Sequence, residues 1–87
     1  MNILSINKLH DAQSKYPSAI KQLQGWYQVV KQTDFASADA LRETFGDMRG
    51  FRSSFKFPIP VSSLLAYTTI NFDAKVLIIE EIKPGNH

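Results

Sequence analysis

The spacing of apolar residues divides the chain into a helical first half and an extended second half. Up to about residue 45, apolar side chains recur every three or four positions, as they do on one face of a helix. From residue 50 onward they alternate with polar side chains, which is the period of a half-buried strand. The pattern predicts an α+β fold, with N-terminal helices packed on one face of a small antiparallel sheet of three strands or slightly more.

Two helices are predicted in the first 32 residues, after a short strand or lead-in at residues 2–4. Ser5 is a residue type favoured at helix N-caps, and Pro17 disfavours helical backbone in the residue before it. The first helix should therefore run from Ser5 to near Tyr16. The second begins at Pro17, and its apolar face carries Ile20, Leu23, Tyr27 and Val30. A short third helix is predicted near residues 37–46, with Ser37 as its cap.

Alternation in the first case, and β-branched, aromatic and apolar runs in the other two, predict three strands in the second half. The first is a continuous strand from residue 50 to about residue 59; one side carries Phe51, Ser53, Phe55, Phe57 and Ile59. Its other side carries Arg52, Ser54, Lys56 and Pro58. Residues 64–72 and 75–82 form the next two strands, joined by a tight turn. The same alternation places the neighbouring Glu80 and Glu81 on opposite faces of the last strand.

Composition changes this picture little. The 87 residues fit a single domain over residues 1–87. No apolar run approaches the roughly 18 residues of a membrane helix, and no apolar block follows a charged N-terminus as in a signal peptide. Cysteine is absent, which is compatible with a reducing cytoplasm. We expect a cytoplasmic protein without membrane association.

The clearest charge feature is a run of cations without an acid in the first predicted strand. Arg49, Arg52 and Lys56 alternate there with aromatic residues, and Lys83 lies near the end of the chain. Because the rings fall on the opposite face, they are predicted as core rather than as a platform for stacked bases. The four cations are candidates for binding RNA phosphates. The alternative is an ordinary solvated strand face.

The sequence offers no other site of equal clarity. Two distant histidines and no cysteine predict neither a metal site nor a cofactor, and the four glycines form no phosphate loop. His10 is expected on a helix surface, and His87 at the terminus is not expected to act as a base. Leu65 and Tyr67 lie on the less apolar side of the middle strand. If no helix covers that side, they are a candidate surface for a protein partner.

Several stretches resemble a known family in order and spacing. They are KYP (residues 15–17), WYQVV (26–30), LRETF (41–45), FKFPI (55–59) and INFDAKVLII (70–79). Together they resemble the HigB-type toxins, which are RelE-like mRNA interferases of type II toxin–antitoxin systems. The resemblance implies a RelE-like fold and a cognate antitoxin partner. In active members it implies endoribonuclease cleavage of mRNA that depends on the ribosome.

The chain departs from the family where the family carries its functional residues. VSSLLAY (61–67) has no cation where members have an arginine, and Glu80 and Glu81 stand near another arginine position. The end of the chain, IKPGNH, lacks the family's THxxYD-like segment. No catalytic residue is therefore carried over. Two hypotheses remain: an mRNA interferase toxin, or a non-catalytic HigB-like protein-interaction module that has lost its nuclease residues.

Overall fold

The structure is a computed structural model that describes residues 1–45, 49–59 and 62–85, with Arg49 and Phe51 described by their backbone alone. Its elements in chain order are β1 (Asn2–Leu4), α1 (Ile6–Lys15), the 3₁₀ turn η1 (Pro17–Ala19), α2 (Ile20–Gln32), α3 (Ala38–Phe45), β2 (Arg49–Phe51), β3 (Ser54–Pro58), β4 (Leu64–Asn71) and β5 (Val76–Pro84).

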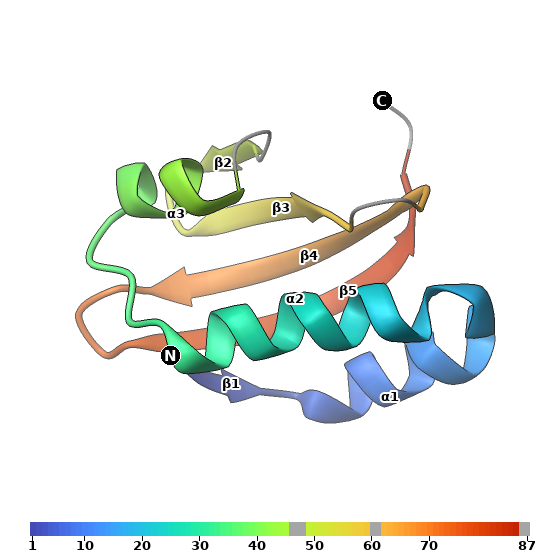
Figure 1. The fold of residues 1–87 in the computed structure, drawn as a ribbon. Helices are drawn as coiled ribbons and strands as arrows, with labels where there is room; N and C mark the ends of the chain where they lie inside the picture. The colour runs from blue at the N-terminus through green and yellow to red at the C-terminus, as the bar shows by residue number, and fades with distance from the viewer. Residues whose placement is uncertain (46–48, 60–61, 86–87) are drawn as a thin grey trace.

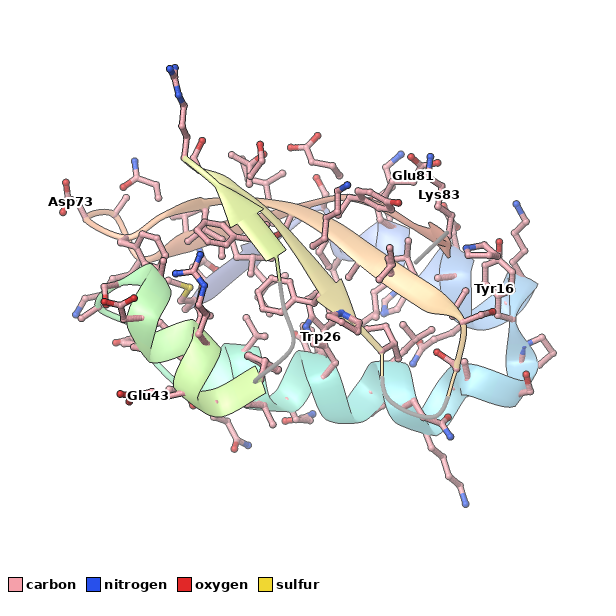
Figure 2. The ribbon with its side chains drawn as sticks, turned by 90° about the horizontal axis from the view of Figure 1, so that it is seen from above. Tyr16, Trp26, Glu43, Asp73, Glu81 and Lys83 are labelled. Atoms are coloured by element: carbon pink, nitrogen blue, oxygen red, sulfur yellow. The ribbon has the colours of Figure 1, made fainter. Side chains whose placement is uncertain are left out.

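The strands form one sheet in the order β1-β5-β4-β3-β2 (Figure 1). Neighbouring strands are antiparallel except β1, which runs parallel to β5. The three α-helices pack on the same face of this sheet (Figure 1 and Figure 2). The predicted α+β class is confirmed. The segment at residues 2–4, predicted as a short strand or lead-in, forms β1, and the first predicted strand is divided into β2 and β3. We call the face opposite the helices the open face.

The helix boundaries follow the proline and cap signals closely. Helix α1 ends at Lys15, immediately before Tyr16, as Pro17 predicts. The Oγ atom of Ser37 accepts a hydrogen bond from the Ala40 N–H at 3.4 Å, which confirms the predicted cap of α3. Ser5 holds the cap position of α1 with a left-handed φ of 62° and without a side-chain cap. Among the described residues, no helix has the length and apolar character needed to cross a membrane.

The prediction of one continuous strand from residue 50 to residue 59 is wrong. A two-residue turn at Arg52 and Ser53 divides it into β2 and β3, so that Phe51 pairs with Ser54. Arg52 adopts a left-handed φ of 59° in this turn. Sequence reasoning missed the turn because it lacks the glycine, asparagine or aspartate that usually marks a two-residue hairpin loop. Arg52 consequently lies at the hairpin tip and not beside Lys56 on one strand.

The aromatic side of β3 faces the helices, as predicted. Phe55, Phe57 and Ile59 are all buried, whereas Lys56 between them is exposed. The Trp26 ring of α2 meets the Phe57 ring edge-on, with 5.6 Å between the ring centroids. Figure 2 shows Trp26 between α2 and the sheet. These rings form the core and are not available to stack on bases.

A β-bulge interrupts the alternation of β5. Tyr67 pairs with Glu81, but the next residue of β4 pairs with Ile79, so Glu80 is an extra residue. Ile79 and Ile82 are buried in the core, and both glutamates between them are exposed. The prediction that alternation places Glu80 and Glu81 on opposite faces is wrong, because the bulge turns both side chains away from the core.

The α-amino group of Met1 closes the C-terminal end of α2. It is buried and donates hydrogen bonds to the carbonyl oxygens of Val30, Lys31 and Thr33 at 3.2, 3.3 and 2.9 Å. A cation at this end of a helix complements the helix dipole. The same amino group lies 3.0 Å from a carboxylate oxygen of Asp34, whose second oxygen lies 3.7 Å from the Lys75 ammonium group.

This ion cluster predicts an acid-dependent loss of stability. The hydrogen bond and charge of the Met1 amino group, and more weakly Lys75, lower the pKa of Asp34, although desolvation opposes them. A carboxyl with a lowered folded-state pKa adds stability above its unfolded pKa of about 3.9, and that stability disappears as the pH falls through the lowered value. At pH 7 wild type should therefore unfold at a higher urea midpoint than Asp34→Asn. The difference between the two midpoints should disappear as the pH is lowered.

The matched control for this titration is Asp11→Asn. Asp11 is exposed on α1 and forms no ion pair with any residue in the described ranges. Urea midpoints of the untagged proteins from pH 7 to about pH 2.5 would measure the effect, since that range spans ordinary and lowered carboxyl pKa values. A wild-type advantage over Asp34→Asn that stays constant across this range would contradict the prediction.

Candidate nucleic-acid interface

A row of aligned residues crosses four strands of the sheet. Arg49 of β2 pairs with Lys56 of β3, Lys56 pairs with Tyr67 of β4, and Tyr67 pairs with Glu81 of β5. The buried residues of β3 and β5 face the helices, so the exposed Lys56 and Glu81 are on the open face. The strand register thus aligns residues that lie up to 32 positions apart in the sequence. Arg49 belongs to this row by its backbone position.

Tyr67 is the centre of this row and has a lysine on either neighbouring strand. The Nζ atom of Lys83 lies 5.2 Å from the centroid of the Tyr67 ring, and that of Lys56 lies 5.5 Å away. Both distances are within the range of cation–π attraction, worth about 0.5–1 kcal/mol at exposed sites. The half-buried ring is therefore flanked by two ammonium groups on an exposed surface. We call Lys56, Tyr67 and Lys83 the lysine–tyrosine cluster.

One acid is already in contact with this cluster. A carboxylate oxygen of Glu81 lies 3.3 Å from the Lys83 Nζ atom, and both side chains are about half exposed. Figure 2 shows Glu81 and Lys83 together, on the side of the sheet away from α2. Exposed ion pairs of this kind contribute only about 0–1 kcal/mol. A phosphate group can therefore replace Glu81 at Lys83 at small cost.

Beside the cluster the open face is hollowed. The hollow has a volume of about 330 Å³, and its lining comes from all four strands β2 to β5: Gly50, Ser54, Phe55, Lys56, Tyr67, Thr68, Thr69 and Glu80. Its floor is fixed by a buried hydrogen bond that the Thr68 hydroxyl donates to the Phe55 carbonyl at 3.0 Å. Glu80 and Lys56 thus line the same hollow.

The structure groups some of the predicted binding residues and separates others. Lys56 and Lys83 meet at Tyr67, and Arg49 joins their row by backbone register. Arg52 lies at the hairpin tip, where it lines a different hollow together with Asp73. The RNA-binding role assigned to these four cations stays a prediction.

The two residues predicted to contact a protein partner differ in exposure. Tyr67 is half-buried on the open face, whereas Leu65 is only 7% exposed. The backbone of Gly85 passes so close to Leu65 that a Cβ atom there would lie 2.1 Å from a Leu65 methyl carbon. Of the two, Tyr67 is the one whose surface a partner reaches in this structure, and the partner-binding role of both stays a prediction.

Sequence reasoning noted Glu80 and Glu81 only as acids near an arginine position of the family and did not include them among the candidate site residues. A signal was present, because the run Ile-Ile-Glu-Glu-Ile at residues 78–82 sets two acids side by side between apolar residues. Regular alternation would bury one of the two glutamates, and a bulge avoids this. Of the two histidines, His10 is exposed on α1, as predicted, and His87 lies outside the described residues. The described residues also contain no group of three side chains suited to a metal ion.

Fold and site together describe a class of small α+β protein. Helices cover one face of its sheet, and the open face presents cations around an aromatic residue, an arrangement that suits an anionic polymer. No family model matches the chain. The sequence is similar to the mRNA interferase HigB of Escherichia coli O6:H1 (strain CFT073), with 27% identity over 85 residues. The aligned region covers 94% of this chain and 82% of that protein, and it supports a distant relationship to HigB toxins.

Proposed function

We propose that this protein is the toxin component of a type II toxin–antitoxin module and cleaves mRNA. Two findings support the proposal: the similarity to a HigB mRNA interferase over most of the chain, and the lysine–tyrosine cluster on the open face. The cluster is the observation that carries it, because two ammonium groups, each within 5.5 Å of the centroid of the same ring, place two cations on one exposed surface where RNA phosphates would bind. We further propose that the toxin works in the cytoplasm on ribosome-bound mRNA and that a cognate antitoxin neutralises it.

The chemistry expected of this site is attack of a ribose 2′-hydroxyl on the adjacent phosphorus. Negative charge grows on the phosphate oxygens as this bond forms, and fixed cations stabilise that charge more than they stabilise the ground state. Lys56 and Lys83 would supply these cations, and the Tyr67 ring would keep them together. Arg49 is placed by its register to extend the same site along the RNA backbone.

Controlled expression in bacteria tests the proposal. Wild type should arrest growth and produce new mRNA ends. Lys56→Ala/Lys83→Ala should weaken cleavage about 100-fold or more, since removal of one preorganised charge-stabilising group costs about that much in characterised enzymes. The matched control is Lys8→Ala/Lys21→Ala, which removes the same charge from exposed positions on α1 and α2. Equal toxicity of the two double variants would contradict the proposed role of the cluster.

The acids of the open face favour a second candidate, a non-catalytic protein-interaction module. Glu81 pairs with Lys83, and Glu80 adds another anion to the same face, so the positive charge available to RNA is reduced. For this candidate the expression experiment gives a folded chain, normal growth and intact mRNA. A partner protein held through Tyr67 would then be sought by comparing wild type with Tyr67→Ala.

A further inference from the structure

The proposed cleavage requires a group that takes the proton from the attacking 2′-hydroxyl. Histidine is the commonest such group, but the histidine in the described part of the chain, His10, lies on α1, and α1 packs on the face of the sheet opposite the open one (Figure 1). We infer that Glu80 is the proton acceptor, an inference that rests on the proposed function. Glu80 is the extra residue of the β-bulge in β5, and it lines the hollow together with Lys56 and Tyr67 of the lysine–tyrosine cluster.

The geometry distinguishes Glu80 from its neighbour. Glu80 lines the hollow beside Lys56 and Tyr67, and its carboxylate forms no ion pair within the described part of the chain. Glu81 instead lies 3.3 Å from Lys83. The Glu81 carboxylate therefore already has a cation as its partner. Glu80 is therefore the acid of the pair that is available to take a proton.

The hollow also matches the size of the reacting group. Its volume of about 330 Å³ is close to the lower end of small-molecule sites, roughly 300–1,000 Å³, which suits one ribose with its phosphate. Ser54 and Thr69 add hydroxyl groups at its wall. A nucleotide here has a base and a cation within reach of adjacent atoms, which is the requirement for proton transfer coupled to attack.

The step balances with groups that the chain itself supplies. The 2′-hydroxyl proton moves to the Glu80 carboxylate as the bond from O2′ to phosphorus forms. The bond from phosphorus to O5′ breaks, and O5′ takes a proton from the Lys56 ammonium group. The products are a 2′,3′-cyclic phosphate and a 5′-hydroxyl end, and proton exchange through water between Glu80 and Lys56 restores both groups. Nothing is oxidised or reduced.

Cleavage kinetics of purified Glu80→Gln test this role. RNA is supplied both free and on translating ribosomes, and rate, affinity and pH profile are measured. Glu80→Gln should slow the chemical step about 100-fold or more, the usual contribution of a general base. It should bind RNA at least as tightly as wild type, because it removes a negative charge. The rise in rate as a carboxyl ionises should be present in wild type and absent from this variant.

Two further variants separate base chemistry from charge. Glu81→Gln removes the same charge one residue away and should keep the ionisation-dependent rise in rate. Glu43→Gln is a control on the exposed side of α3, where Figure 2 shows the side chain pointing away from the sheet. An RNA whose 5′-bridging oxygen is replaced by sulfur needs no acid for departure of the leaving group. Lys56→Ala should therefore cleave this RNA faster than it cleaves ordinary RNA. Glu80→Gln should cleave both RNAs slowly.

The outcomes distinguish this inference from the proposed function. If wild type cleaves RNA and folded Glu80→Gln cleaves at the same rate with the same pH profile, Glu80 is not the base and the toxin assignment stands. If Glu81→Gln loses the rise in rate together with Glu80→Gln, the assignment to Glu80 is overturned. If wild type cleaves no RNA, free or on ribosomes, the proposed function fails and the inference fails with it.

Discussion

The Phe57→Ala variant is expected to lose a large part of the stability of the fold. The Phe57 side chain is fully buried, and its ring lies edge-on to both Trp26 and Phe45, at centroid distances of 5.6 and 5.0 Å. Removal of a buried phenylalanine ring typically costs about 3–5 kcal/mol. Small domains are stable by only about 5–15 kcal/mol in total. Urea unfolding followed by Trp26 fluorescence should show a midpoint shifted far below that of wild type.

Val29→Ala provides the comparison for this prediction. Val29 is apolar but 39% exposed on α2, so its truncation should change the free energy of unfolding by no more than about 0.5 kcal/mol. Similar losses in the two variants would show that the Phe57 ring is not the centre of the core. A Phe57→Ala midpoint equal to that of wild type would contradict the packing of β3 against α2.

Two glycine-to-alanine variants are expected to shift stability in opposite directions. A Cβ atom at Gly50 would lie 2.3 and 2.4 Å from two carbons of the Phe55 ring, so the buried ring or β2 must move. Such overpacking costs about 1–3 kcal/mol. At Gly25, in the middle of α2, a Cβ atom would meet nothing within 4 Å. Alanine there should stabilise the helix by about 0.5–1 kcal/mol.

Urea or thermal unfolding of both alanine variants beside wild type measures the difference. Because the chemical change is the same, effects on the unfolded chain largely cancel between the two variants. Gly50→Ala should unfold before wild type and Gly25→Ala after it. Gly50→Ala with unchanged or raised stability would show that β2 does not approach Phe55 as closely as the structure places it.

Local signals in the sequence were sufficient for much of the fold. Pro17 marks the break between α1 and α2, and Ser37 marks the start of α3. Alternation identifies the buried side of β3 through Phe55 and Phe57. The turn between β4 and β5 also falls where it was predicted, at residues 72–75. In each case the physical cause lies within a few residues of the feature that it determines.

The features that the sequence did not predict depend on contacts between distant segments or on irregular backbone. No local pattern specifies that β1 pairs in parallel with β5. The turn at Arg52 and the bulge at Glu80 each break the regular alternation on which the predictions rested. Lys56 and Lys83 were predicted separately as cations. Their meeting at Tyr67 follows from strand register, which turn length and bulges determine.

The place of β5 in the sheet has a consequence for how the protein forms. This strand lies between β1 and β4, so the strand at the start of the chain has no partner until residues 76–84 have been synthesised. Contacts between such distant segments also form slowly in folding. Lys83, Glu80 and Glu81 all belong to β5. The growing chain therefore lacks the completed open-face site while its own ribosome is still translating the sequence upstream of β5, and the site is assembled only after β5 has been synthesised.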